Sequence, residues 1–199
     1  RSPIELYESL IKKHKEGLSF KNVVVFNLFE YYPLDTTSTQ SCLSQINEMF
    51  CKHVDIDSNN IYSPNSSLPQ NEIMKHCSEY EKKIDENGGL DFQVLGIGPA
   101  GNIAFNEPGS QQSSQSRLIL LDPVSRKEAT RVFGTVDRVP TAAITMGVGT
   151  ILKAKRIALL AWGDSKAEIV KNVVEGQITD QLPASFLQLH HNATVFLDL

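Results

Sequence analysis

Residues 96–109, GIGPAGNIAFNEPG, combine a glycine-rich turn with side chains suited to acid–base and hydrogen-bond chemistry. The run follows an apolar segment typical of a β-strand, so the turn is expected at the carboxyl end of that strand. Open parallel sheets bind ligands there, because glycine turns and helix N-termini bring backbone amides together. Glu107 offers a titratable carboxyl group and Asn102 an amide. A lone Gly-x-Gly also occurs as a plain strand-to-helix turn, so a structural role stays open.

Two further segments follow predicted strands in the same way. Residues 27–31 come after the first strand, and residues 163–166, GDSK, come after the fifth. Backbone amides at a helix start, together with the Lys166 ammonium, could hold a phosphate group. A single lysine is more often a solvated surface residue, and that interpretation also stays open.

The elements that position these turns can be predicted from apolar periodicity. Short runs rich in Val, Ile and Leu predict strands over 22–28, 91–97, 117–121, 142–146, 156–162 and 194–198. Helical spacing predicts helices over 3–16, 40–52, 70–87 and 164–175, the last with Asp164 or Ser165 as N-cap, and a surface loop over 57–70. This alternation predicts an α/β fold with a doubly wound, mostly parallel, Rossmann-like sheet covered by helices on both faces.

Composition excludes several classes of function. The 199 residues fit a single domain, and the net charge of −4 argues against a nucleic-acid binder. No apolar run approaches the roughly 18–20 residues that span a bilayer, and the N-terminus lacks a signal-peptide pattern. The three cysteines have neither metal-type nor redox-type spacing, which predicts reduced thiols in a cytoplasmic protein. We expect no cofactor, no metal and no membrane partner.

Several motifs in one order resemble the glucosamine-6-phosphate deaminase/isomerase family, whose active-site run reads G-x-G-x-D-G-H-I-A-F-N-E-P. Besides residues 96–109, they are FKNVVVFNLFEYYPL, HVDIDSNNI, RVPTAAITMGVGTIL and LQLHHNA, and they extend over nearly the whole chain. The resemblance implies a three-layer fold and a hexosamine 6-phosphate as substrate. In that family the sugar ring opens, a proton moves from C2 to C1, and ammonia leaves.

The acid–base positions of that family are mostly substituted in this chain. The resemblance places Phe29 where the family has its proton-shuttling Asp, Asn102 where it has the ring-opening His, and Ala100 where it has the supporting Asp. Glu107, which assists the His, is retained. Glu30 is adjacent to Phe29, but neighbouring side chains of a strand point to opposite faces, so it cannot take over the role of the missing Asp.

The phosphate-binding positions are better preserved. The resemblance implies that Arg131, Lys166 and Ser2 contact the substrate phosphate, with Ser2 as the last part of a phosphate loop. Ser110 and Arg117 match two positions of an allosteric site known in bacterial members. Ile119 replaces a basic residue of that site, so we interpret Arg117 as the start of a strand.

These residues lead to one hypothesis and two alternatives. We expect one deaminase/isomerase-like domain over 1–199, truncated at both ends, that binds a hexosamine 6-phosphate with deaminase activity lost or strongly reduced. The first alternative is an active enzyme with altered sugar-phosphate chemistry that uses Glu107. The second is an oligomerisation or docking module of a larger protein. We also expect a homo-oligomer and, on the same parent chain, a further domain.

Overall fold

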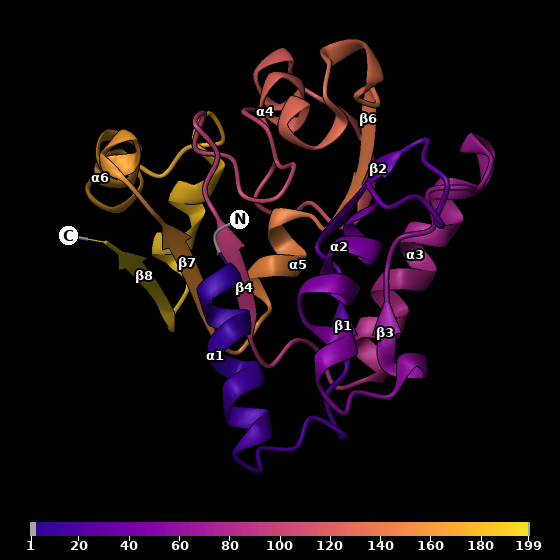
Figure 1. Cartoon of the computed structure of the whole chain (residues 1–199). Helices are drawn as coiled ribbons and strands as arrows, with labels where there is room; N and C mark the ends of the chain where they lie inside the picture. The colour runs from indigo at the N-terminus through magenta and orange to yellow at the C-terminus, as the bar shows by residue number, and fades with distance from the viewer. Residues whose placement is uncertain (1–2, 199) are drawn as a thin grey trace.

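The computed structural model describes residues 3–198 as helices packed around three small sheets (Figure 1). The strands are β1 (Val25–Phe26), β2 (Phe29–Tyr32), β3 (Ile61–Tyr62), β4 (Gln93–Gly96), β5 (Arg117–Leu120), β6 (Ala142–Thr145), β7 (Ile157–Ala161) and β8 (Ala193–Leu197). The helices are α1 (Ile4–Lys15), α2 (Cys42–Met49), α3 (Gln70–Glu86), α4 (Pro123–Phe133), α5 (Val148–Leu152) and α6 (Ala167–Glu175).

Two of the sheets are parallel. Strands β4, β7 and β8 lie side by side in that order, and β1 pairs with β3. Every residue of β7 is buried, as its unbroken apolar run predicts for a strand covered on both faces. The main core packs Leu95 of β4 and Leu159 of β7 against Ile151 of α5 and Val173 of α6. The predicted α/β class with parallel strands is therefore confirmed.

The third sheet is antiparallel and has the order β2-β6-β5. Phe29, Thr145 and Arg117 form one rung of this sheet, so their side chains share a face. Helix α4 covers that face with Ala129 and Phe133, and α3 covers the opposite face with residues that include Ile73 and Cys77 (Figure 1).

Some predicted boundaries are wrong. The strand expected over 22–28 is reduced to the two residues of β1, and the expected loop over 57–70 contains β3, which pairs with β1. Local sequence patterns also did not predict the short strand β2 or the helices α4 and α5. These elements are stabilised by tertiary pairing and packing, which local periodicity does not report.

The predicted N-cap of the last helix is also wrong. A three-residue 3₁₀ turn takes up Asp164–Lys166, so α6 begins at Ala167 with Lys166 as N-cap and no side-chain cap. By contrast, Ser41 caps α2 by accepting a hydrogen bond from the Ser44 amide, and Asp122 caps α4 through the Val124 amide.

The three cysteines are free, as expected, and burial raises the pKa of both Cys51 and Cys77 to about 11.

Within residues 3–198, no helix combines the length and apolar character that a membrane crossing requires. The same residues contain no group of three or more His, Cys, Asp or Glu side chains arranged to hold a metal ion.

Candidate functional site

The turn after β4 is closed by its own backbone. The Gly98 amide donates to the Asn102 carbonyl at 2.9 Å, and the Gly101 amide donates to the Gly98 carbonyl at 3.0 Å. A Cβ at Gly98 would lie 2.0 Å from Asn102 Oδ1. Gly101 has φ +71°, and its Cβ would lie 2.0 Å from Leu182 Cδ1. Glycine is therefore required at both positions, and the turn holds Asn102 in a fixed place.

Asn102 presents an unused acceptor within this turn. Its side chain is buried, with 7% of its surface exposed, and Nδ2 donates to the Ala104 carbonyl at 3.2 Å. Oδ1 is buried and has no hydrogen-bond partner among residues 3–198. Leaving a buried acceptor unpaired costs about 1–3 kcal/mol, so this oxygen is an unfavourable feature of the turn as it stands. Ala100, two residues earlier, is half-buried and contributes only a methyl group.

Phe29 belongs to an aromatic cluster beside the turn. Its ring centroid lies 4.3 Å from that of Phe105 and 6.5 Å from that of Tyr31. The position therefore holds an apolar side chain packed on neighbouring rings, with no group that can take a proton.

Glu30 faces away from Phe29, as the alternation of a strand requires. It is 1% exposed and accepts hydrogen bonds from the amides of Tyr31, Cys42 and Leu43 at 2.9, 3.0 and 3.2 Å. Burial raises the pKa of Glu30, against the opposing effect of these amide donors. The carboxyl group thus fixes the start of α2 to β2 and does not reach the Phe29 side of the sheet.

Asn106 and Arg117 brace the far end of the turn. Asn106 is fully buried, and its Nδ2 donates to the carbonyls of Ile103 at 3.0 Å and Met146 at 2.8 Å. Its Oδ1 accepts from Arg117 Nη1 at 2.9 Å, while Arg117 Nη2 donates to Ser110 Oγ at 3.0 Å. Arg117 does begin β5, as predicted. The role of Asn106 could not be predicted from the sequence, because no local sequence pattern indicates that an Asn side chain is buried.

Glu107 lines a cleft of about 560 Å³, whose wall includes Phe105, Ser110, Arg117 and Ile119. Its Oε1 accepts a hydrogen bond from Ser125 Oγ of α4 at 2.6 Å. Its Oε2 is buried and unpaired within the described part of the chain.

The surroundings of Glu107 favour its protonated form. Burial raises the pKa of this carboxyl, and the nearby charges of Asp122 and Glu128 raise it further, against the lowering effect of the Ser125 hydrogen bond. Glu107 is therefore the side chain of this turn best suited to exchange a proton.

The predicted phosphate ligands lie on different elements of the fold. Lys166 Nζ donates to the Ile97 carbonyl at 2.9 Å, which places the ammonium at the turn with two N–H groups left over. Arg131 lies exposed in the last turn of α4. Ser2 lies outside the described residues.

A sequence model of the family described as glucosamine-6-phosphate isomerases/6-phosphogluconolactonase matches residues 1–196. This chain belongs to that family. The predicted resemblance is thereby confirmed, and with it membership among deaminase-like proteins of sugar-phosphate metabolism.

Curated relatives agree with this assignment. The chain is 52% identical over 199 residues to a glucosamine-6-phosphate deaminase-like protein of Bacteroides thetaiotaomicron, and this match covers all of the chain but 30% of that protein. It is 42% identical over 197 residues to a glucosamine-6-phosphate deaminase of Corynebacterium urealyticum, covering 99% of the chain and 76% of that enzyme. The chain thus spans less than a third of the Bacteroides protein and about three quarters of the Corynebacterium enzyme.

Solved structures confirm the fold. A monomeric glucosamine-6-phosphate deaminase superposes with a TM-score of 0.95 at 40% identity, covering 98% of this chain and 81% of that chain. The 6-phosphogluconolactonase of Thermotoga maritima superposes with a TM-score of 0.74 at 23% identity over 99% of this chain and 80% of that chain, a likeness of fold alone.

Proposed function

We propose that this chain is a hexosamine 6-phosphate-binding domain of amino-sugar metabolism in which deaminase activity is lost or strongly reduced. The observation that carries the proposal is Phe29, whose ring packs on Phe105 where the family has a proton-shuttling Asp. The neighbouring carboxyl group, Glu30, is committed to the start of α2. Removing one general acid or base typically lowers a rate by about 10²–10⁴, and losses in groups that act together need not multiply.

Binding of the sugar phosphate is supported by groups that remain available. Lys166 keeps two N–H donors beside the turn, Arg131 is exposed on α4, and Asn102 Oδ1 is a buried acceptor with no hydrogen-bond partner within residues 3–198. A phosphate dianion is well matched by a guanidinium and an ammonium group, and an amide oxygen accepts from a sugar hydroxyl.

The test restores the missing groups. The triple variant Phe29→Asp, Ala100→Asp, Asn102→His should release ammonia from glucosamine 6-phosphate at least ~100-fold faster than the wild-type chain. The matched control is Phe29→Asn, Ala100→Asn, Asn102→Gln, which adds polar side chains that do not titrate and should give no gain. No gain in the first variant, despite demonstrated substrate binding, would contradict the proposal.

A second candidate function rests on Glu107. Its buried, unpaired Oε2 and its raised pKa suit an acid–base group of a sugar-phosphate reaction that needs no proton transfer at C2. In that case Glu107→Gln should abolish the activity, while the exposed Glu8→Gln should leave it intact. A fully active Glu107→Gln enzyme would eliminate this candidate.

We further propose a cytoplasmic location, self-association of the chain and a further domain on the same parent chain. The longer Bacteroides relative, of which this chain covers 30%, supports the last point. Size-exclusion chromatography with light scattering tests self-association, and a monomer at all concentrations would rule out the oligomer.

A further inference from the structure

Helix α4 carries a polar side chain on the face that it buries. Its buried residues are Ser125, Ala129 and Phe133, which are spaced by four positions and therefore lie on one face. Ala129 and Phe133 pack in the apolar cluster that includes Phe105. Ser125 is 8% exposed, at a position where this spacing predicts an apolar residue. Burying a hydroxyl group is unfavourable unless it is hydrogen-bonded, so the partner of Ser125 indicates its role.

The hydroxyl group of Ser125 bonds to a residue far from it in the sequence. A serine within a helix commonly donates to the carbonyl group four residues earlier in the same helix. Ser125 Oγ instead donates to Glu107 Oε1 at 2.6 Å, across 18 residues of sequence. This distance is typical of a hydroxyl group that donates to a carboxylate. The bond therefore ties the first turn of α4 to the carboxyl group of Glu107.

This bond makes the two oxygens of the Glu107 carboxyl group unequal. The backbone of Glu107 is fixed by the turn, because its amide donates to the Phe105 carbonyl at 3.1 Å and its carbonyl accepts from the Ser110 amide at 3.0 Å. Oε1 is occupied by the Ser125 hydroxyl group, whereas Oε2 is buried and unpaired within residues 3–198. A protonated carboxyl group carries its proton on one oxygen, and Oε2 is the oxygen without a donor.

The surroundings of Glu107 give the Ser125 hydrogen bond an electrostatic effect. Burial raises the pKa of Glu107, and the Ser125 hydrogen bond lowers it. The charges of Asp122 and Glu128 on α4 raise this pKa as well. Arg117 of β5 lines the same cleft, but its Nη1 and Nη2 donate to other side chains. Ser125 is thus a neutral donor that stabilises the ionised form of Glu107.

We propose that Ser125 is a positioning residue, whose hydroxyl group holds Glu107 Oε1 so that Glu107 takes up and releases its proton at Oε2. This role rests on the second candidate function, in which Glu107 exchanges a proton with a sugar phosphate. The hydrogen bond itself exists without a ligand, so its effect on Glu107 can be measured in the 199-residue protein alone.

The test is a titration of the Glu107 carboxyl carbon, followed by ¹³C NMR. The signal is assigned by its loss in Glu107→Gln. Ser125→Ala removes the hydroxyl group and should raise the pKa of Glu107 by about one pH unit, because the ionised carboxylate loses a donor. Ser125→Thr keeps a hydroxyl group at this position, so the pKa of Glu107 should stay near its wild-type value.

The matched control is Ala129→Gly, one turn further along the same buried face of α4. It weakens the packing of the helix but leaves the donor to Glu107 in place, so the pKa of Glu107 should not change. The proposal would be overturned by an unchanged pKa in Ser125→Ala, by an equal shift in Ala129→Gly, or by equal pKa values in Ser125→Ala and Ser125→Thr.

Failure of the candidate function itself gives a different result. It would appear as absence of glucosamine 6-phosphate binding by the wild-type chain, measured by calorimetry, while Ser125→Ala still shifts the pKa of Glu107. That result would contradict the sugar-phosphate function and would support the hold of Ser125 on the Glu107 carboxyl group.

Discussion

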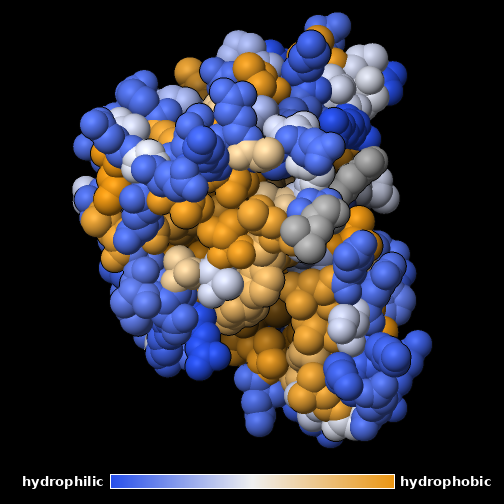
Figure 2. Space-filling view, turned by 90° about the vertical axis from the view of Figure 1, so that its left-hand side faces the viewer, coloured by the Kyte–Doolittle hydropathy of each residue, from blue (hydrophilic) through white to orange (hydrophobic). Residues whose placement is uncertain are grey.

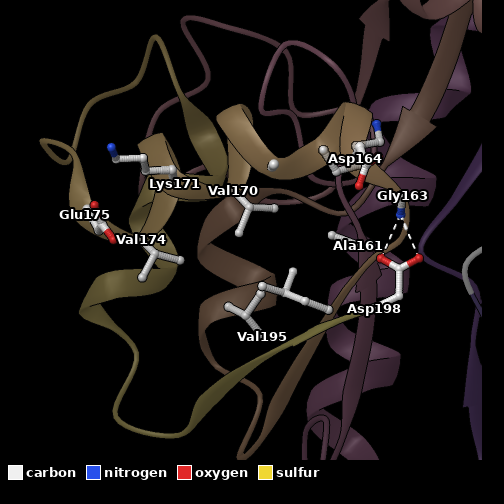
Figure 3. A pocket seen from close by; sticks show the side chains of 12 residues that line it. Ala161, Gly163, Asp164, Val170, Lys171, Val174, Glu175, Val195 and Asp198 are labelled. Carbon is white, nitrogen blue, oxygen red and sulfur yellow. Dashed lines mark hydrogen bonds between the residues drawn. The ribbon is translucent and has the colours of Figure 1, made fainter.

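The turn after β4 and the groove between α6 and β8 differ in how far their side chains are paired or buried within the chain. In the turn, Asn106 hydrogen-bonds to Arg117 and to the carbonyls of Ile103 and Met146, so this part of the turn is held by bonds within the chain. In the groove between α6 and β8 (Figure 3), on the side of the molecule that Figure 2 shows, apolar side chains such as Val174 and Leu197 are about half exposed, and within residues 3–198 no strand pairs with the outer edge of β8. The frame of the candidate site is thus held by bonds within the chain, whereas the apolar side chains of the groove are left partly exposed.

The residues that hold the turn in shape can be separated from those that occupy the family's acid–base positions. The residues that hold the turn, Gly98, Gly101 and Asn106, are not the ones that transfer protons in the family. Substitution at Phe29, Ala100 and Asn102 therefore leaves the frame folded. This separation is consistent with the proposed sugar-phosphate-binding domain.

The largest loss of stability is expected from a substitution that breaks the hydrogen bonds of the turn after β4. Asn106→Leu removes three buried side-chain hydrogen bonds, to Arg117 Nη1 and to the carbonyls of Ile103 and Met146, and should lower the free energy of unfolding by about 3 kcal/mol or more. Urea denaturation with linear extrapolation measures the change. Asn71→Leu on the exposed side of α3 is the control, with a change within about 0.5 kcal/mol. A loss below about 1 kcal/mol at Asn106 would show that these bonds do not hold the turn.

A smaller effect is expected at the aromatic cluster. Phe29→Asp removes the ring that packs 4.3 Å from Phe105 and puts a carboxylate among apolar neighbours. The free energy of unfolding at neutral pH should fall by about 2 kcal/mol. Phe92→Asp, at a position 55% exposed, should change little. Equal losses in the two variants would mean that Phe29 is not packed as described.

The raised pKa of Glu107 predicts that the stability of the fold depends on pH. Because its pKa is raised in the folded protein, the folded state holds the Glu107 proton more tightly than the unfolded chain does. Its contribution to stability is therefore present at low pH and is lost as the pH rises from the ordinary value of 4.5 through the raised pKa. Relative to Glu107→Gln, the wild type should lose stability over that interval, measured by urea denaturation at successive pH values. A parallel pH profile for both proteins would contradict the raised pKa.

The smallest change in the free energy of unfolding is expected for a substitution in the groove between α6 and β8. Val173 and Val174 are neighbours on α6, but Val173 is 2% exposed and Val174 is 48% exposed. Val173→Thr should cost about 1–2 kcal/mol, because it buries a hydroxyl group. Val174→Thr should stay within about 0.5 kcal/mol in the 199-residue protein. A larger loss at Val174 would show that the groove is already covered.

Sequence patterns predicted the parts whose signal is local. The apolar run of β7, the stripe of α3 and the opposite directions of Phe29 and Glu30 all follow from periodicity. The antiparallel sheet could not be predicted from periodicity, because β2 and β5 pair with β6 through contacts between residues that are far apart in the sequence. The same holds for Ser125 with Glu107, which are 18 residues apart, and for Lys166 with Ile97, which are 69 apart.

The most direct test of the account measures ammonia and ketose phosphate release from glucosamine 6-phosphate, with binding of the same compound measured in parallel. The account predicts saturable binding with little or no turnover. Turnover near the typical enzyme kcat of about 10 s⁻¹ would contradict it, since a proton path would then exist despite Phe29 and Asn102.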